Sequence, residues 1–169
     1  MRAPRPRLKA KDATPSRATS VPTPVPHVPA PATFRIGTAG WALPRECRDA
    51  FAEDGSNLQR YASRFGAVEI NSSFYGIPSA AAARGWVERT PPGFEFSLKL
   101  YQKFTHPGMF HRATGRDPWD LTGRDVDEFR AGLDPIAAAG KLGALLAQFP
   151  PSFRNGPDSR GYLEWLLER

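Results

Sequence analysis

The chain of 169 residues is long enough for one domain and short for two. Its net charge of +6 belongs mostly to the first 33 residues, which carry six Lys or Arg against one acid, whereas the remainder carries 17 basic and 16 acidic residues. A nucleic-acid-binding face needs basic residues on the folded domain itself, so this distribution argues against a nucleic-acid partner.

Cysteine usage and hydropathy exclude further classes of protein. Cys47 is the single cysteine, so no internal disulfide and no multi-cysteine metal site can form, which fits a reducing compartment. No apolar run approaches the roughly 18 residues of a membrane span, and the first residues lack the apolar stretch of a secretory signal. We therefore expect a cytoplasmic chain with no membrane partner.

Residues 1–32 form a segment of their own, with eight of the 18 prolines and few large apolar residues. Such a sequence cannot bury enough apolar surface to offset its ordering entropy, so it predicts a disordered basic tail with polyproline II character. A linker is the plain interpretation. The alternative is a docking motif, PTPVP, for a proline-binding partner.

From Phe34 onward, predicted strands alternate with predicted helices. Apolar runs and alternation predict strands at Phe34–Trp41, Val68–Tyr75, Phe94–Tyr101 and Leu142–Phe149. Helical spacing and capping residues predict helices at 57–65 (cap Asn57), 80–89 (cap Ser79), 126–139 (cap Asp125, with Pro135 inside) and from Gly161 onward. The span 102–123 lacks any period and predicts a long functional or partly disordered loop. Strands that alternate with helices predict a parallel sheet.

Side-chain alternation within the strands distinguishes two parallel architectures. In the third strand Phe96 and Leu98 share one face while Ser97 and Lys99 share the other, and the second strand divides in the same way. A doubly wound sheet buries both faces, whereas a barrel can line its interior with polar groups near its top. No G-x-G-x-x-G follows a strand. We therefore predict an α/β fold of TIM-barrel-like (β/α) units, with about four of eight present.

Polar side chains on the inner face suggest a site. Glu69, Asn71, Lys99 and Gln148 would converge inside the barrel, where Glu69 and Lys99 on neighbouring strands can pair. Such a pair can act as a general base with a substrate clamp, or it can be a structural ion pair that fills the interior. His106 is a candidate proton carrier.

Histidines and aromatic residues in and near the predicted loop allow further interpretations. His106 and His111 make a poor ligand set without nearby carboxylates or thiols, so we expect no metal. Trp41 and Tyr75 lie at predicted strand ends, where aromatic rings can stack a ligand or simply cap the core.

Four segments, FRIGTAGW, VEINSSFYGIPS, FEFSLKLYQKFTH and LGALLAQFPPSF, resemble in this order the YecE-like family, also called domain of unknown function 72. The resemblance covers residues 33–169 as the N-terminal part of that domain. It implies a TIM-barrel-like fold with no settled activity. It also implies a pocket at the residues Trp41, Glu69, Asn71, Tyr75, Lys99, His106 and Gln148.

These observations lead us to expect a barrel domain that binds or transforms a small polar or phosphorylated ligand at the C-terminal face of its strands. Glu69, Lys99 and His106 would be the catalytic residues, and Trp41, Asn71, Tyr75 and Gln148 would bind the ligand. The alternatives are a non-catalytic binding or scaffold protein, or an inactive fragment, and the sequence leaves any cofactor unknown. A full barrel takes about 250 residues, so four units would leave two open edges through which the chain could self-associate.

Overall fold

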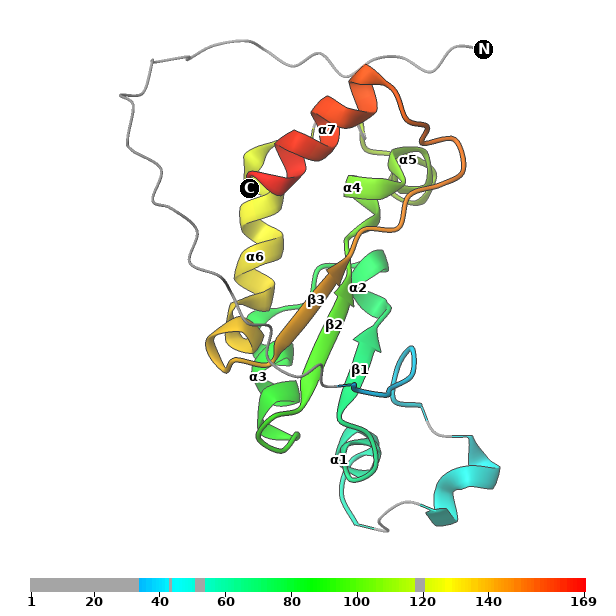
Figure 1. Ribbon diagram of the computed structural model, residues 1–169, viewed down its shortest axis with the longest axis vertical. Coiled ribbons are helices and arrows are strands. Elements are labelled where there is room, and N and C mark those ends of the chain that lie inside the picture. The colour runs from blue at the N-terminus through cyan, green and yellow to red at the C-terminus, as the bar shows by residue number, and fades with distance from the viewer. Residues whose placement is uncertain (1–33, 43, 51–53, 118–120) are drawn as a thin grey trace, which may run out of the picture. The chain divides into compact units, whose positions relative to one another are not determined.

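The computed structural model describes residues 34–42, 44–50, 54–117 and 121–169. The predicted disordered tail at residues 1–32 lies outside the described residues. From Arg35 onward the chain forms one compact unit of parallel strands and helices (Figure 1). It is an α/β structure that corresponds to part of a TIM-barrel-like fold.

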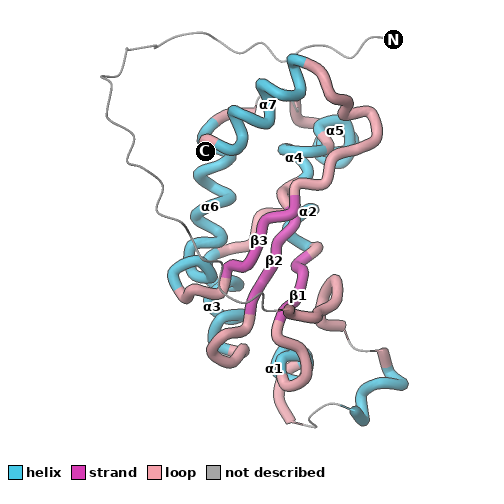
Figure 2. Tube along the Cα trace, viewed as in Figure 1, coloured by secondary structure: helices cyan, strands magenta, loops and turns pink. Residues whose placement is uncertain are grey.

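Three parallel strands form a sheet in the order β1–β2–β3, as Figure 2 shows. They are β1 (Ala67–Ile70), β2 (Glu95–Lys99) and β3 (Leu142–Leu146). The last two fall within predicted strands, and β1 begins one residue before the predicted strand Val68–Tyr75. The predicted second strand is shorter than expected because the chain turns after Ile70 into the helix α2 (Ser72–Tyr75). The parallel direction and the strand order agree with consecutive (β/α) units.

The predicted first strand, Phe34–Trp41, is wrong as a regular strand. Only a single parallel bridge joins it to β1 within the described residues, between Ala39 and Glu69. The Thr38 amide donates to Tyr61 Oη at 2.7 Å, and Glu69 N donates to Thr38 O at 3.0 Å. This part of the chain therefore follows β1 on the side away from β2, but a side chain occupies a backbone donor that a strand would need.

Besides α2, the structure describes these helices: the 3-10 helix Arg45–Ala50, α1 (Asn57–Ala62), α3 (Ala80–Glu88), α4 (Gln102–Thr105), α5 (Pro107–Thr114), α6 (Gly123–Ala138) and α7 (Pro157–Leu167). The long loop expected over 102–123 is therefore wrong, because it contains α4 and α5. Pro107 begins α5, and Gly115 ends it with a left-handed φ of 69°. Phe104 of α4 and Phe110 of α5 are buried and hold these two short helices against the core. The spacing of the two phenylalanines in the sequence does not follow a helical period, so hydrophobic periodicity did not predict these helices.

Two of the three predicted helix caps are displaced. Ser56, not Asn57, caps α1, since Ser56 N donates to the Gln59 side chain at 2.8 Å in a capping box. Thr122 caps α6, and Asp125 instead accepts the Thr122 amide at 2.8 Å. Ser79 caps α3 as predicted.

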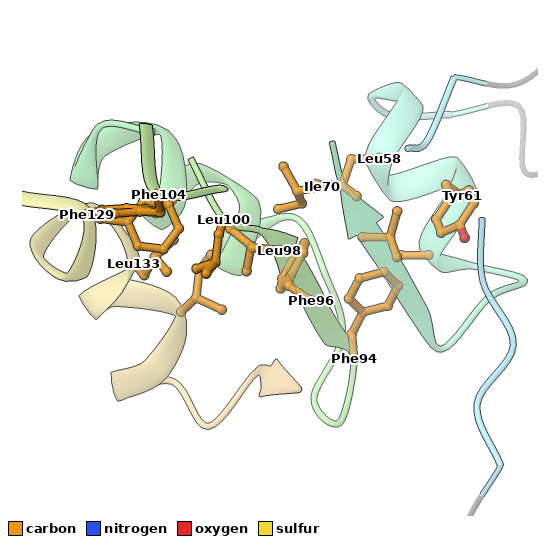
Figure 3. Packing of buried hydrophobic residues seen from close by; sticks show 14 of the residues in the cluster. Leu58, Tyr61, Ile70, Phe94, Phe96, Leu98, Leu100, Phe104, Phe129 and Leu133 are labelled. Carbon is orange, nitrogen blue, oxygen red and sulfur yellow. The ribbon is translucent and has the colours of Figure 1, made fainter. Parts of the chain in front are cut away.

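The apolar face of the sheet carries the core. Val68 and Ile70 of β1 and Phe96 and Leu98 of β2 are buried, whereas the residues between them are partly exposed. Figure 3 shows the two ends of this core. Tyr61 of α1 lies near Phe94 at one end, with ring centroids 6.4 Å apart. Phe104 and Phe129 pack at the other end, beside Leu100, with their centroids 5.6 Å apart.

Lys141, just before β3, is a buried cation at the end of α3. Its ammonium donates to Val87 O at 2.9 Å, Thr90 O at 2.8 Å and Thr90 Oγ1 at 2.9 Å. Burial lowers the pKa of this lysine. Because all three acceptors lie in the last turn of α3 or just after it, Lys141 joins that helix end to the start of β3.

Candidate functional site

The inner face of the sheet carries the polar side chains that the alternation predicts. Glu69, Ser97 and Lys99 are partly exposed and alternate with buried apolar residues. The register places Glu69 beside Ser97, and Lys99 lies two residues further along β2. Within the described residues no ion pair joins Glu69 to Lys99, so the pair that the sequence allowed is not formed. Lys99 instead reaches the carboxyl end of the sheet.

A cluster of aromatic and basic side chains lies at the carboxyl ends of β1 and β2. The Lys99 ammonium lies 5.3 Å from the centre of the Phe74 ring, close enough for a cation–π interaction. The His106 ring packs edge-on against the same Phe74, with centroids 5.2 Å apart. The Tyr75 ring also packs edge-on against Phe74, with centroids 5.0 Å apart, and 71% of the Tyr75 surface is exposed. Three predicted site residues therefore meet around Phe74, and we call these four residues the Phe74 cluster.

Ser73 holds the Phe74 cluster in place. Its Oγ lies 2.7 Å from Ile70 O at the end of β1 and 2.7 Å from Lys99 O at the end of β2. The buried hydroxyl thus ties α2 to both strand ends and fixes the position of Phe74. This role could not be recognised from the sequence because the predicted strand Val68–Tyr75 included Ser73, although serine is a common turn residue after a strand.

The environment of His106 favours the neutral imidazole. Burial lowers the pKa of His106 from its ordinary 6.5, and the nearby positive charge of Lys99 lowers it further. The ring Nδ1 lies 3.0 Å from Thr105 Oγ1. A neutral imidazole can both donate and accept a hydrogen bond, so His106 can take up a proton or bind a polar group.

Trp41 and Asn71 meet at a separate hollow near the end of β1. This open hollow of about 260 Å³ is lined by Gly40, Trp41, Ala42, Asn57, Ile70, Asn71 and Ser72. Trp41 packs edge-on against Trp86 of α3 at 5.8 Å, so it lies toward the helix layer rather than in the Phe74 cluster. Asn57 was missed as a lining residue because its position suggested a helix cap.

Gln148 and His111 lie apart from both groups. Gln148 is exposed two residues beyond β3, and within the described residues no hydrogen bond joins it to Lys99 or His106. His111 is exposed on α5, and its Nδ1 lies 2.9 Å from Arg116 O. In the part of the chain that the structure describes, no three or more His, Cys, Asp or Glu side chains gather to hold a metal.

Helix length and composition bear on the membrane prediction. Within the described residues, no helix combines the length and the apolar character that a bilayer crossing requires.

Comparison with curated proteins finds bacterial relatives. The chain is 35% identical over 130 residues to the UPF0759 protein YunF of Bacillus subtilis, and the match covers 77% of this chain and 44% of YunF. It is 29% identical over 118 residues to the UPF0759 protein YecE of Escherichia coli, and that match covers 70% of this chain and 38% of YecE. The chain thus spans less than half the length of either relative.

Solved structures of DUF72 family proteins share the fold. A protein from Enterococcus faecalis matches with a TM-score of 0.64 at 24% identity, over 79% of this chain and 46% of its own. A protein from Thermotoga maritima matches with a TM-score of 0.56 at 29% identity, over 79% of this chain and 51% of its own. The family model for the protein of unknown function DUF72 matches residues 35–169. The chain therefore belongs to the DUF72 family, whose YecE-like members the sequence motifs resemble.

Proposed function

We propose that this YecE-like domain binds a small polar ligand with an anionic group, such as a phosphate, at the carboxyl ends of β1 and β2. The observation that supports this most is the position of Lys99. Its ammonium lies on an aromatic ring at the end of a strand, where no ion-paired carboxylate is found within the described residues. A cation held in this way attracts an anion without first having to break a salt bridge.

The other site residues have roles that follow from their places around Lys99. His106, whose ring packs against Phe74, would donate a hydrogen bond to the ligand or accept its proton. Glu69, two residues deeper on the inner face, would serve as the anchor or base for a group that reaches inward. Tyr75 would cover the ligand with its exposed ring. Trp41, Asn71 and Gln148 would contact the parts of a larger ligand that extend beyond this cluster.

The experiment titrates the full chain with inorganic phosphate in a phosphate-free buffer and follows the His106 imidazole resonances by NMR. We expect a saturable shift in the wild type and an affinity about tenfold lower or worse in Lys99→Gln, since a charge-assisted hydrogen bond contributes about 1.5–3 kcal/mol. Lys99→Arg should retain binding. The matched control is Arg84→Gln, which removes an exposed cation from α3 and should change nothing. An unchanged phosphate response in Lys99→Gln would refute the proposal.

The cellular setting follows from the only cysteine in the sequence. Cys47 is exposed and, as the single cysteine, has no intramolecular partner. A single exposed thiol is most compatible with a reducing environment, which supports our proposal of a cytoplasmic location.

A second candidate function is a non-catalytic scaffold, which the exposed apolar edge of β3 favours. Leu145 and Leu146 are both exposed, although they occupy opposite faces of the strand.

A further inference from the structure

His106 joins α4 to α5, and both helices hold its backbone. Its amide donates to Gln102 O at 2.7 Å, so the residue ends α4. Its carbonyl accepts the amides of Met109 and Phe110 at 2.9 Å and 3.0 Å, so the residue also begins α5. The imidazole therefore projects beside the Phe74 ring from a backbone that these hydrogen bonds fix.

The hydroxyl of Thr105 contacts the imidazole of His106. Thr105 Oγ1 lies 3.0 Å from His106 Nδ1, and Thr105 is 2% exposed. Within the described residues, this nitrogen is the only hydrogen-bond partner of the hydroxyl. Burial and, to a lesser extent, the charge of Lys99 lower the pKa of His106, so the ring is neutral at neutral pH. A neutral imidazole carries its proton on one nitrogen only, so the ring has two possible tautomers.

A count of donors and acceptors distinguishes the two tautomers. A protonated Nδ1 would donate to Thr105 Oγ1, and the hydroxyl proton would then have no acceptor in the described part of the chain. A buried donor without a partner destabilises the folded chain. A hydroxyl that donates to a bare Nδ1 satisfies both groups and leaves the ring proton on Nε2. The buried position of Thr105 therefore favours the second arrangement.

We propose that Thr105 holds His106 in the Nε2–H tautomer, so that the ring donates a hydrogen bond to the ligand and does not take up a proton from it. Nδ1, the basic nitrogen of this tautomer, already accepts the Thr105 hydroxyl. Thr105 is thus a positioning residue that acts through His106. The donor role rests on the proposed binding at Lys99, whereas the tautomer is a property of the free chain.

This tautomer narrows the class of group that the site binds. The Lys99 ammonium can only donate hydrogen bonds, and the Nε2–H of neutral His106 is also a donor. Both groups lie against the Phe74 ring. Two donors suit a group that offers acceptors only, which is a fully ionised oxyanion. Sulfate, which has no proton to give at neutral pH, should therefore bind in the same way as phosphate.

His111 provides the opposite tautomer within the same chain. Its Nδ1 lies 2.9 Å from Arg116 O. A carbonyl oxygen can only accept a hydrogen bond, so Nδ1 of neutral His111 must carry the proton. The spectrum of one sample therefore contains both patterns, and each serves as the reference for the other.

NMR of the nitrogen-15-labelled, ligand-free full chain tests the tautomer. Above pH 6.5 we expect a bare Nδ1 and a protonated Nε2 in His106, and the reverse in neutral His111. The signals of His106 are identified by their loss in His106→Gln. A protonated Nδ1 in wild-type His106 would overturn the proposal whether or not any ligand binds.

Variants of Thr105 test its positioning role. Thr105→Val keeps the shape of the side chain and removes the hydroxyl, so His106 should become a mixture of tautomers. Thr105→Ser keeps a hydroxyl and should retain the Nε2–H form. The matched control is Thr114→Val on α5, which removes a hydroxyl that donates to Phe110 O and should leave the His106 tautomer unchanged. A His106 tautomer that is the same in Thr105→Val as in the wild type would overturn the role of Thr105.

Titration with sulfate and with phosphate tests the donor role. Sulfate should shift the Nε2 resonance of wild-type His106, and Thr105→Val should bind it about two- to tenfold more weakly, which is the contribution of one neutral hydrogen bond. A response to phosphate without a response to sulfate overturns the donor role alone. No response to either anion overturns the binding proposed at Lys99 and the donor role with it, whereas the spectrum of the free chain decides the tautomer.

Discussion

The imidazole of His106 packs edge-on against Phe74 with a ring separation of 5.2 Å, while the Lys99 ammonium lies over the same ring. The Phe74 ring is thus in contact with both a titratable imidazole and a lysine ammonium. Burial lowers the pKa of His106 most, and the charge of Lys99 adds to this effect. Protonation of His106 is therefore opposed by the charge of Lys99, and we call this effect the coupling of the two groups.

This coupling predicts how stability depends on pH. The pKa of His106 is lower in the folded chain than its ordinary 6.5, so the folded chain binds fewer protons than the unfolded chain between those two values. The contribution of neutral His106 to the stability of the folded chain is therefore complete above pH 6.5, and it is lost as the pH falls through the pKa of His106 in the folded chain. Urea unfolding of wild type and His106→Gln should therefore differ less as the pH is lowered across this window.

Lys99→Gln supplies the control for this prediction. Removing the ammonium should raise the pKa of His106 toward 6.5, which NMR titration of the imidazole measures directly. A His106 pKa that stays unchanged in Lys99→Gln would contradict the coupling. An equal difference between wild type and His106→Gln at all pH values would contradict the stability prediction.

The ion pair between Lys103 and Asp125 predicts a large loss of stability. Lys103 Nζ lies 2.6 Å from Asp125 Oδ1, and the two side chains are 5% and 18% exposed. Burial raises the pKa of Asp125, but hydrogen bonds from Lys103 and Thr122 outweigh it and lower the pKa overall. Asp125→Ala should cost about 3–5 kcal/mol at neutral pH, because it leaves a buried ammonium without this carboxylate.

Denaturant unfolding checks the value, with Asp125→Asn as the variant that keeps the side-chain volume while it removes the charge and replaces one acceptor oxygen by a donor. Because the folded pKa of Asp125 is lowered, its contribution is present above the ordinary value of 3.8 and is lost as the pH falls. A neutral-pH effect below about 0.5 kcal/mol, the size of an ordinary surface substitution, would show that the pair contributes little.

Two glycines inside helices predict opposite effects of the same substitution. A Cβ at Gly132 of α6 would lie 2.4 Å from Pro78 O, whereas a Cβ at Gly161 of α7 meets nothing within 4 Å. Gly161→Ala should stabilise the chain by about 0.5–1 kcal/mol through helix propensity. Gly132→Ala should destabilise it by about 1–3 kcal/mol, because α6 must move away from the backbone of Pro78. Thermal unfolding measures both, and the same sign in both would contradict the packing of α6.

Strand alternation could be predicted from the sequence because it is a local property. Phe96 and Leu98 face the core and Lys99 faces inward, as the period of two requires. The first segment could not be predicted, because the hydroxyl that binds the Thr38 amide comes from Tyr61, 23 residues away. Hydrophobic periodicity contains no information about a contact of this kind.

The site could be predicted only in part for a related reason. Lys99, His106 and Tyr75 do lie near one another, because strand ends and the turns after them meet at one edge of a parallel sheet. Trp41 does not join them, since its ring found a partner in Trp86 of a different layer. The neighbour against which an aromatic ring packs depends on the complete packing of the core. It does not follow from the position of the residue in the sequence.

The three oxygens around Lys141 have a chemical consequence. An amine that donates all three of its protons inside the protein offers no lone pair to an acylating reagent. Modification of Lys141 therefore requires the end of α3 to separate from the start of β3. We therefore expect acylation of Lys141 to be slower than that of the more accessible Lys99, with a rate that reports how often the end of α3 separates from the start of β3.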